Sequence, residues 1–180
     1  GTNLRTDEYG GPIENRIRLL GEVTQRLVDV WGSDRVAVRL SPNGDSQGAD
    51  DATPVETFTA AAKLLDQIGI AFLELREPPA HGTYGNTDIP PVSPDIRPVF
   101  KGPLVLNSDY FYDNATAALA DGKADAISFG RTFMTNPDLP ERFRAGADLN
   151  PIDFTPTWYS QGPEGYIDYP AMEEKETASA

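Results

Sequence analysis

Arg39 is the residue of this sequence whose position points most directly to chemistry. It lies in the apolar run 36–40, and alternation along a strand puts it on the face opposite to the aliphatic residues. If those aliphatics pack on helices, the guanidinium points to the interior of a sheet or barrel. There it needs an anion or several acceptors, because it does not lose its proton. Two interpretations stay open: a salt bridge within the sheet, to Glu74 or Glu77, or a ligand that develops negative charge.

A phosphate site is predicted where two later apolar runs end. The run 126–129 is followed at once by Gly130 and Arg131. Glycine lets a backbone amide approach an oxyanion closely, and arginine offers two parallel donors. The preceding run leads to Ser108 and Asp109, whose backbone amides would form the other side. Loops after the last two strands of a β/α barrel often bind phosphate.

Other polar residues give weaker signals. His81 lies in a proline-rich loop with Tyr84, and is either simply solvated or in contact with a substrate. Gly10 and Gly11 lack the lysine and the spacing of phosphate-binding loops, which excludes that interpretation. The pair Asp50-Asp51 is expected to cap the following helix, and no metal site is predicted.

Composition excludes several classes of protein. The 180 residues carry 15 basic and 28 acidic side chains, a formal net charge of −13, which disfavours nucleic acid and anionic lipid as partners. The absence of cysteine excludes disulfides and thiolate metal sites, and a single histidine excludes a multi-histidine zinc site. No apolar run approaches the roughly 18 residues that a membrane span needs, so a cytoplasmic protein is expected.

The elements that would position these residues alternate between helix and strand. Buried strands are predicted at 36–40, 71–75, 103–106 and 126–129. Helices are predicted at 14–31, from a capping box at Thr53 to Gly69, from Asp113 to Leu119, and from 136 to Gly146. A short helix can begin at Ser93 within the long loop 78–98. This alternation predicts an α/β fold with a parallel sheet.

Five ordered motifs carry a resemblance to a known family. They are residues 3–11 (NLRTDEYGG), 14–18 (ENRxR), 38–42 (VRLSP), 129–139 (FGR…NPDL) and 159–170 (Y…EGYIDYP). In this order and spacing, over about residues 2–171, the chain resembles the Old Yellow Enzyme family of FMN-dependent ene-reductases. The resemblance implies an oxidoreductase that uses NAD(P)H to reduce activated alkenes. Some members also reduce nitrate esters and nitroaromatics.

The resemblance also implies which part of the fold this chain represents. Residues 1–171 match the C-terminal half, strands five to eight, of an FMN-binding (β/α)8 TIM barrel, and residues 172–180 are expected to be a disordered acidic tail. Half a barrel exposes sheet edges and an apolar interior. We therefore expect a second polypeptide that carries strands one to four. The family's proton donor and substrate-activating pair belong to that half, so no catalytic residue is expected in this chain.

By the same resemblance, individual residues acquire roles. Arg39 matches the arginine that faces the N1/O2 edge of the flavin, where reduced FMN carries negative charge. Tyr159, and more loosely Trp158, match aromatic residues that flank the flavin and substrate pocket, and His81 is a further pocket candidate. Gly130 and Arg131 match the phosphate-binding pair.

The chain departs from the family where the phosphate loop begins. Family members often carry glycine at the position of Ser108, and a small or amide residue at the position of Asp109. An aspartate beside a phosphate is tolerated only if its side chain turns away, so Asp109 is expected to act through its backbone amide.

Two further functions are considered. A related flavin barrel with an appended iron–sulfur segment is disfavoured because the chain has no cysteine. A non-catalytic half-barrel that binds only phosphate predicts a colourless protein.

Overall fold

The computed structural model describes residues 1–44, 51–80, 82, 87–152 and 162–172. The chain forms two compact units, Gly1–Ser128 and Phe129–Ala180, and each is described by itself. The expected residues Trp158, Tyr159 and His81, and the tail from 173 onward, lie outside the described residues.

The first unit is built on a four-stranded parallel sheet. Its strands are β1 (Ala37–Leu40), β2 (Phe72–Arg76), β3 (Leu104–Asn107) and β4 (Ala126–Ser128). Each strand pairs with the next one along the chain, so the order in space is β1-β2-β3-β4. The four strands predicted from apolar runs are confirmed, with ends shifted by one residue. A sheet whose order never reverses is wound in one direction, as in a β/α barrel and unlike a doubly wound sheet.

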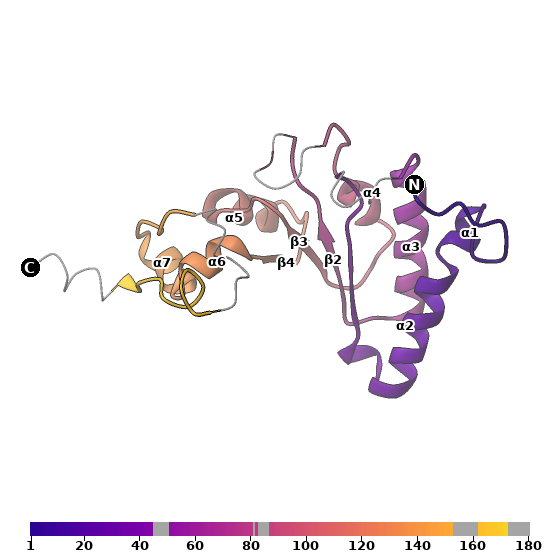
Figure 1. Ribbon diagram of the computed structural model, residues 1–180, viewed down its shortest axis with the longest axis horizontal. Coiled ribbons are helices and arrows are strands. Elements are labelled where there is room, and N and C mark those ends of the chain that lie inside the picture. Colours follow the sequence, from indigo (N-terminus) through magenta and orange to yellow (C-terminus); the bar gives the residue numbers. More distant parts are fainter. Residues whose placement is uncertain (45–50, 81, 83–86, 153–161, 173–180) are drawn as a thin grey trace, which may run out of the picture. The chain divides into compact units, whose positions relative to one another are not determined.

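Two helices precede the sheet where the sequence predicted one. α1 (Ile13–Arg16) and α2 (Arg18–Trp31) are separated by Ile17, whose ψ of −4° opens the helical turn. A short 3₁₀ helix (Ser33–Arg35) follows α2 and leads into β1. Figure 1 shows α2 lying beside α3 (Pro54–Ile68), and the two helices are in contact. Gly21 permits this approach, because a Cβ there would lie 2.8 Å from a methyl carbon of Leu64.

The start of α3 corrects one prediction. Thr53 occupies the N-cap, but its side chain makes no capping hydrogen bond, so the predicted capping box does not form. Asp51 instead fixes the residues around the helix start, accepting hydrogen bonds from the Thr53 amide at 2.8 Å and from the Thr57 hydroxyl at 3.1 Å. Neither bond reaches an amide of the first helical turn, so Asp51 does not form the expected cap, and Asp50 lies outside the described residues. At the other end Gly69 adopts φ +77°, the left-handed conformation that suits glycine.

The core lies on one face of the sheet. Leu73 and Leu75 of β2, with Leu104 of β3, are fully buried and pack with residues of α3 and of α4 (Ser93–Ile96). The short helix α4 confirms the sequence prediction at Ser93. Each fully buried aliphatic side chain contributes about 1.5–3 kcal/mol to folding. Because side chains alternate along a strand, the remaining residues of each strand point to the opposite face. That face carries the polar side chains considered below.

The remaining helices follow the later strands. α5 (Tyr112–Ala120) precedes β4 and was predicted from Asp113. In the second unit α6 (Arg131–Thr135) was not predicted, whereas α7 (Leu139–Ala145) confirms the predicted helix that ends at Gly146. The guanidinium of Arg142 is buried and bonds to the Asp138 carboxylate at 2.6 Å, which fastens the start of α7.

Candidate functional site

Four polar side chains, one from each strand, line the face of the sheet opposite the core. They are Arg39 of β1, Glu74 of β2, Asn107 of β3 and Ser128 of β4. Their strand neighbours of opposite parity, such as Val38 and Leu75, pack in the core. Arg39 therefore points away from the helices, which confirms the prediction made from alternation.

The four side chains form a connected network. Arg39 Nη2 donates to Asn107 Oδ1 at 2.8 Å, and Asn107 Nδ2 donates to the carbonyl and hydroxyl oxygens of Ser128, both at 2.9 Å. The Ser128 hydroxyl donates to Glu74 Oε1 at 2.5 Å. Asn107 and Ser128 are the last residues of their strands, so the network lies toward the carboxyl ends of the sheet. In β/α barrels that end holds the active site.

Glu74, rather than Glu77, is the carboxylate beside Arg39. Arg39 Nη1 lies 3.6 Å from Glu74 Oε1, an ion pair that is longer than a hydrogen bond. The Arg39 side chain is nevertheless 50% exposed, against 16% for Glu74. The salt bridge within the sheet thus exists, and the guanidinium keeps an open side for a further anion.

Glu77 is used differently. Its carboxylate is buried just beyond β2 and accepts the backbone N–H groups of Val92 at 2.6 Å and Ser93 at 3.0 Å. Burial raises the pKa of Glu77 above its usual value. The half-buried hydroxyl of Tyr110 also has a raised pKa, from burial and then from the charge of Glu77. Glu77 therefore fixes the end of the long loop that precedes α4.

The turn after β3 has an unusual backbone. Ser108 and Asp109 have φ values of +98° and +52°, in the left-handed region that glycine adopts most easily. Asn114 of α5 holds this turn, donating to the Asp109 carbonyl at 3.1 Å and accepting the Phe111 amide at 2.6 Å. Strained backbone held by its surroundings is typical of ligand-binding sites. The conformation also explains why glycine suits the position of Ser108.

The carboxylate of Asp109 is directed toward the proline-rich loop. A Cβ on Gly82 would lie 2.7 Å from Asp109 Oδ2, so glycine at this position lets the carboxylate approach the loop closely. That Asp109 offers only its amide to a phosphate stays a prediction.

The remaining residues predicted to bind phosphate belong to the second unit. Gly130 is the N-cap of α6, and Arg131, predicted in a loop, is the first residue of that helix. A Cβ on Gly130 would meet no described atom within 4 Å. Their roles, and those of Ser108 and Asp109, stay predictions.

The side chains of Asn107 and Ser128 belong to the network but were not predicted from the sequence. Parity along the strands places both on the face of Arg39, and this signal was available in the sequence. The hydrogen bonds that join them were not, because they depend on the register between neighbouring strands.

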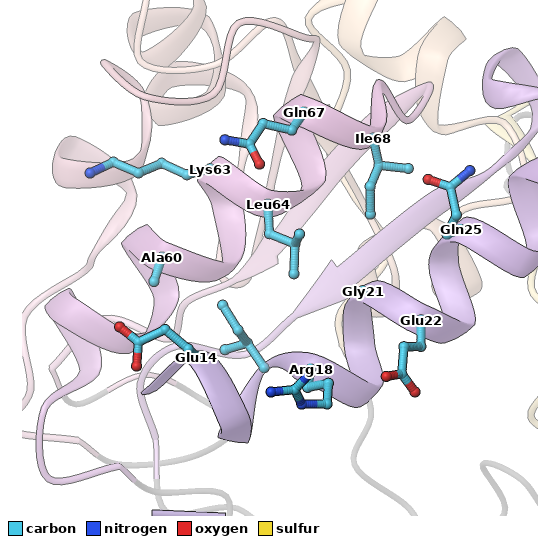
Figure 2. Close-up of a pocket in the computed structure, with 11 residues that line it drawn as sticks. Glu14, Arg18, Gly21, Glu22, Gln25, Ala60, Lys63, Leu64, Gln67 and Ile68 are labelled. Atoms are coloured by element: carbon cyan, nitrogen blue, oxygen red, sulfur yellow. The ribbon is translucent and has the colours of Figure 1, made fainter. Parts of the chain in front are cut away.

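A separate hollow lies between α2 and α3, on the helical side of the sheet. It has a volume of about 660 Å³, and Leu64, Ile68 and Lys63 of α3 line it with Glu22 of α2. Figure 2 shows these side chains around the groove. It contains none of the predicted site residues.

In the parts that the structure describes, no cluster of three or more potential metal ligands occurs. No helix among the described residues is long and apolar enough to cross a membrane.

The parallel sheet in strand order, with polar side chains gathered toward its carboxyl ends, defines a protein of the α/β class. The chain belongs to the NADH:flavin oxidoreductase / NADH oxidase family, whose sequence profile matches residues 1–150, and within it to the Old Yellow Enzyme group.

Its curated relatives include plant reductases. The chain is 38% identical over 174 residues to 12-oxophytodienoate reductase 1 of Oryza sativa subsp. japonica, covering 96% of this chain and 46% of that protein. It is 36% identical over 187 residues to 12-oxophytodienoate reductase 7 of the same organism, covering 96% and 47%. The chain thus spans about half the length of these relatives.

Solved structures agree in fold. The Old Yellow Enzyme homologue of Zymomonas mobilis is 57% identical with a TM-score of 0.91, covering 94% of this chain and 47% of that one. Morphinone reductase is 42% identical with a TM-score of 0.87, covering 97% and 46%. A further structure of morphinone reductase is a complex with tetrahydroNAD.

Proposed function

We propose that this chain supplies the C-terminal half, strands five to eight, of an FMN-binding (β/α)8 barrel that uses NAD(P)H to reduce alkenes conjugated with a carbonyl or nitro group. The proposed substrates also include nitrate esters and nitroaromatics. Relatives that are named as reductases of 12-oxophytodienoate and morphinone support it, as does the complex of one of them with tetrahydroNAD. When bound, FMN supplies the hydride-transfer chemistry.

The observation that carries this proposal is the half-exposed guanidinium of Arg39. It is held toward the carboxyl ends of the strands by Asn107, and its long contact with Glu74 leaves donors for another anion. A fixed cation at this position stabilises the negative charge of reduced FMN at its N1/O2 edge. The residues present therefore fit this cofactor.

The phosphate end of the cofactor is assigned to the loops after β3 and β4. The amides of Ser108 and Asp109, in the left-handed turn, are proposed as one group of donors, and Gly130 with Arg131 as the second. Tyr159 and Trp158 are proposed to flank the ring, and His81 to face the substrate.

Titration of the assembled protein with NADPH tests the function directly. We expect the absorbance of oxidised flavin to bleach on NADPH addition and to return when an activated alkene is added. A purified protein without flavin absorbance, or one whose flavin does not bleach, would contradict the proposal. Binding of phosphate by a colourless protein would favour the non-catalytic phosphate-binding module.

We also propose that a second polypeptide carrying the first four strands docks along α2 and β1. Among the described residues β1 pairs only with β2, so its other edge is available for a further strand. The side chains of Leu19, Val23, Leu27 and Val30 recur at helical spacing on α2 and are between 45% and 73% exposed. Leu20 and Val28 of the same helix already pack against the core, so α2 has a second apolar stripe.

Two matched valine substitutions test this seam. The chain is co-produced with the first half of the Zymomonas mobilis relative, and the complex is measured by size-exclusion chromatography with light scattering. Val23→Glu is expected to abolish the complex, whereas Val55→Glu, at a comparably exposed valine of α3, is expected to preserve it. A chain that is monomeric, folded and FMN-loaded by itself would contradict the need for a partner.

A further inference from the structure

The carboxylate of Glu74 has no role in the proposed chemistry, yet it lies beside Arg39, the cation assigned to the N1/O2 edge of the flavin. Its oxygen Oε1 accepts the Ser128 hydroxyl at 2.5 Å and lies 3.6 Å from Arg39 Nη1. The same oxygen is therefore shared unequally between a hydroxyl and a guanidinium. The first contact is a short hydrogen bond, and the second is too long to be one.

The geometry around this oxygen keeps Arg39 and Glu74 apart. Ser128 holds the carboxylate from β4, while Asn107 holds Nη2 of Arg39 from β3. Asn107 is itself fixed by two bonds to Ser128, so both groups are held by the same pair of residues. Released from Ser128, Glu74 would be able to close on Arg39 as a hydrogen-bonded ion pair.

We propose that Glu74 is a positioning residue that sets the reduction potential of bound FMN through Arg39, with the Ser128 hydroxyl controlling how strongly Glu74 acts. This inference rests on the proposed function. A carboxylate beside the guanidinium offsets part of its positive potential at the flavin's N1/O2 edge. It therefore weakens the preference of the site for reduced, negatively charged FMN over oxidised FMN.

The two residues are predicted to shift the potential in opposite directions. Glu74→Gln removes the negative charge but keeps an acceptor for Ser128, so the potential of FMN rises. Ser128→Ala keeps the charge and releases it toward Arg39, so the potential falls. Asn107 retains the Ser128 carbonyl as an acceptor in that variant, which limits the disturbance. If Glu74 had only a structural role, the two variants would not shift the potential of FMN in opposite directions.

The test measures FMN affinity by fluorescence quenching, and midpoint potential by equilibration with a reference dye, in the FMN-loaded assembled barrel. For Glu74→Gln we expect the ratio of affinities for reduced and oxidised FMN to rise about tenfold, which is about 30 mV for a two-electron couple. Glu56→Gln removes the same charge from an exposed position of α3 and is expected to leave the potential unchanged.

Each outcome bears on a different proposal. Wild-type protein that binds no FMN overturns the proposed function and this inference together. The inference alone is overturned if the protein binds FMN but Glu74→Gln changes the ratio of affinities for reduced and oxidised FMN by less than twofold. Shifts of the same sign in both variants overturn it as well. If Glu74→Gln does not assemble, Ser128→Ala decides: a lowered potential supports the inference and an unchanged one overturns it.

Discussion

The two faces of the four-stranded sheet differ in the burial and in the polarity of their side chains. On one face Leu73, Leu75 and Leu104 are fully buried against helices. On the other, Arg39 is half exposed and belongs to a hydrogen-bonded network. Because successive residues of a strand alternate between these faces, each residue that packs in the core is next in the sequence to one that points to the candidate site. Substitutions at neighbouring residues should therefore have unlike consequences.

Leu75→Ala gives the largest expected effect. It removes a fully buried side chain on the helical face, and the free energy of unfolding is expected to fall by about 2–5 kcal/mol. Urea denaturation of the assembled protein at fixed concentration measures it. A loss below about 1 kcal/mol would mean that this face is not the core.

Arg39→Met gives the complementary result on the open face. Loss of a charge-assisted contact is expected to weaken FMN binding by about 1.5–3 kcal/mol, roughly 10- to 150-fold, since 1.4 kcal/mol is a factor of ten. The methionine keeps an unbranched chain, so the free energy of unfolding should change by less than about 1 kcal/mol without FMN. Fluorescence quenching and urea denaturation provide the two values. A large loss of stability with unchanged FMN affinity would reverse the assignment of this face.

The two faces of the sheet show which structural features could be predicted from the sequence and which could not. Apolar runs located all four strands, and alternation aimed Arg39 correctly, because both depend only on neighbours along the chain. The break at Ile17 and the short helix α6 were missed, since neither has a proline or glycine signal inside it. The sequence offered Glu74 and Glu77 equally as partners of Arg39. Only the register of β1 on β2, which pairs Arg39 with Glu74, separates them.

Glu77, just beyond the end of β2, is expected to make the stability of the protein depend on pH. Burial raises the pKa of this carboxyl from an ordinary value of 4.5, so just above that pH the folded protein binds more protons than the unfolded chain. The contribution of Glu77 to the free energy of unfolding should therefore decline as pH rises from 4.5 through the raised pKa. Urea denaturation of wild type and Glu77→Gln between pH 4.5 and 7 tests this: the difference in stability, wild type minus variant, should fall with pH. A pH-independent difference would contradict it.

Ser108→Gly gives the smallest expected effect. At φ +98° the serine is strained, and glycine should relieve this, raising the free energy of unfolding by up to about 1 kcal/mol. Thermal unfolding with and without FMN measures the change. Destabilisation would indicate that the Ser108 side chain contributes more than the backbone conformation costs.

The order β1-β2-β3-β4 also bears on how the protein is made. During synthesis, each new strand leaves the ribosome next to the one it will join, so pairing within the sheet never has to wait for a distant segment. The free edge of β1 is the exception. Nothing synthesised after it among the described residues covers that edge, and an unpaired edge in a nascent chain is a site for wrong association. The segment that we propose to pair with β1 should therefore raise the yield of folded protein when it is produced before or alongside this chain.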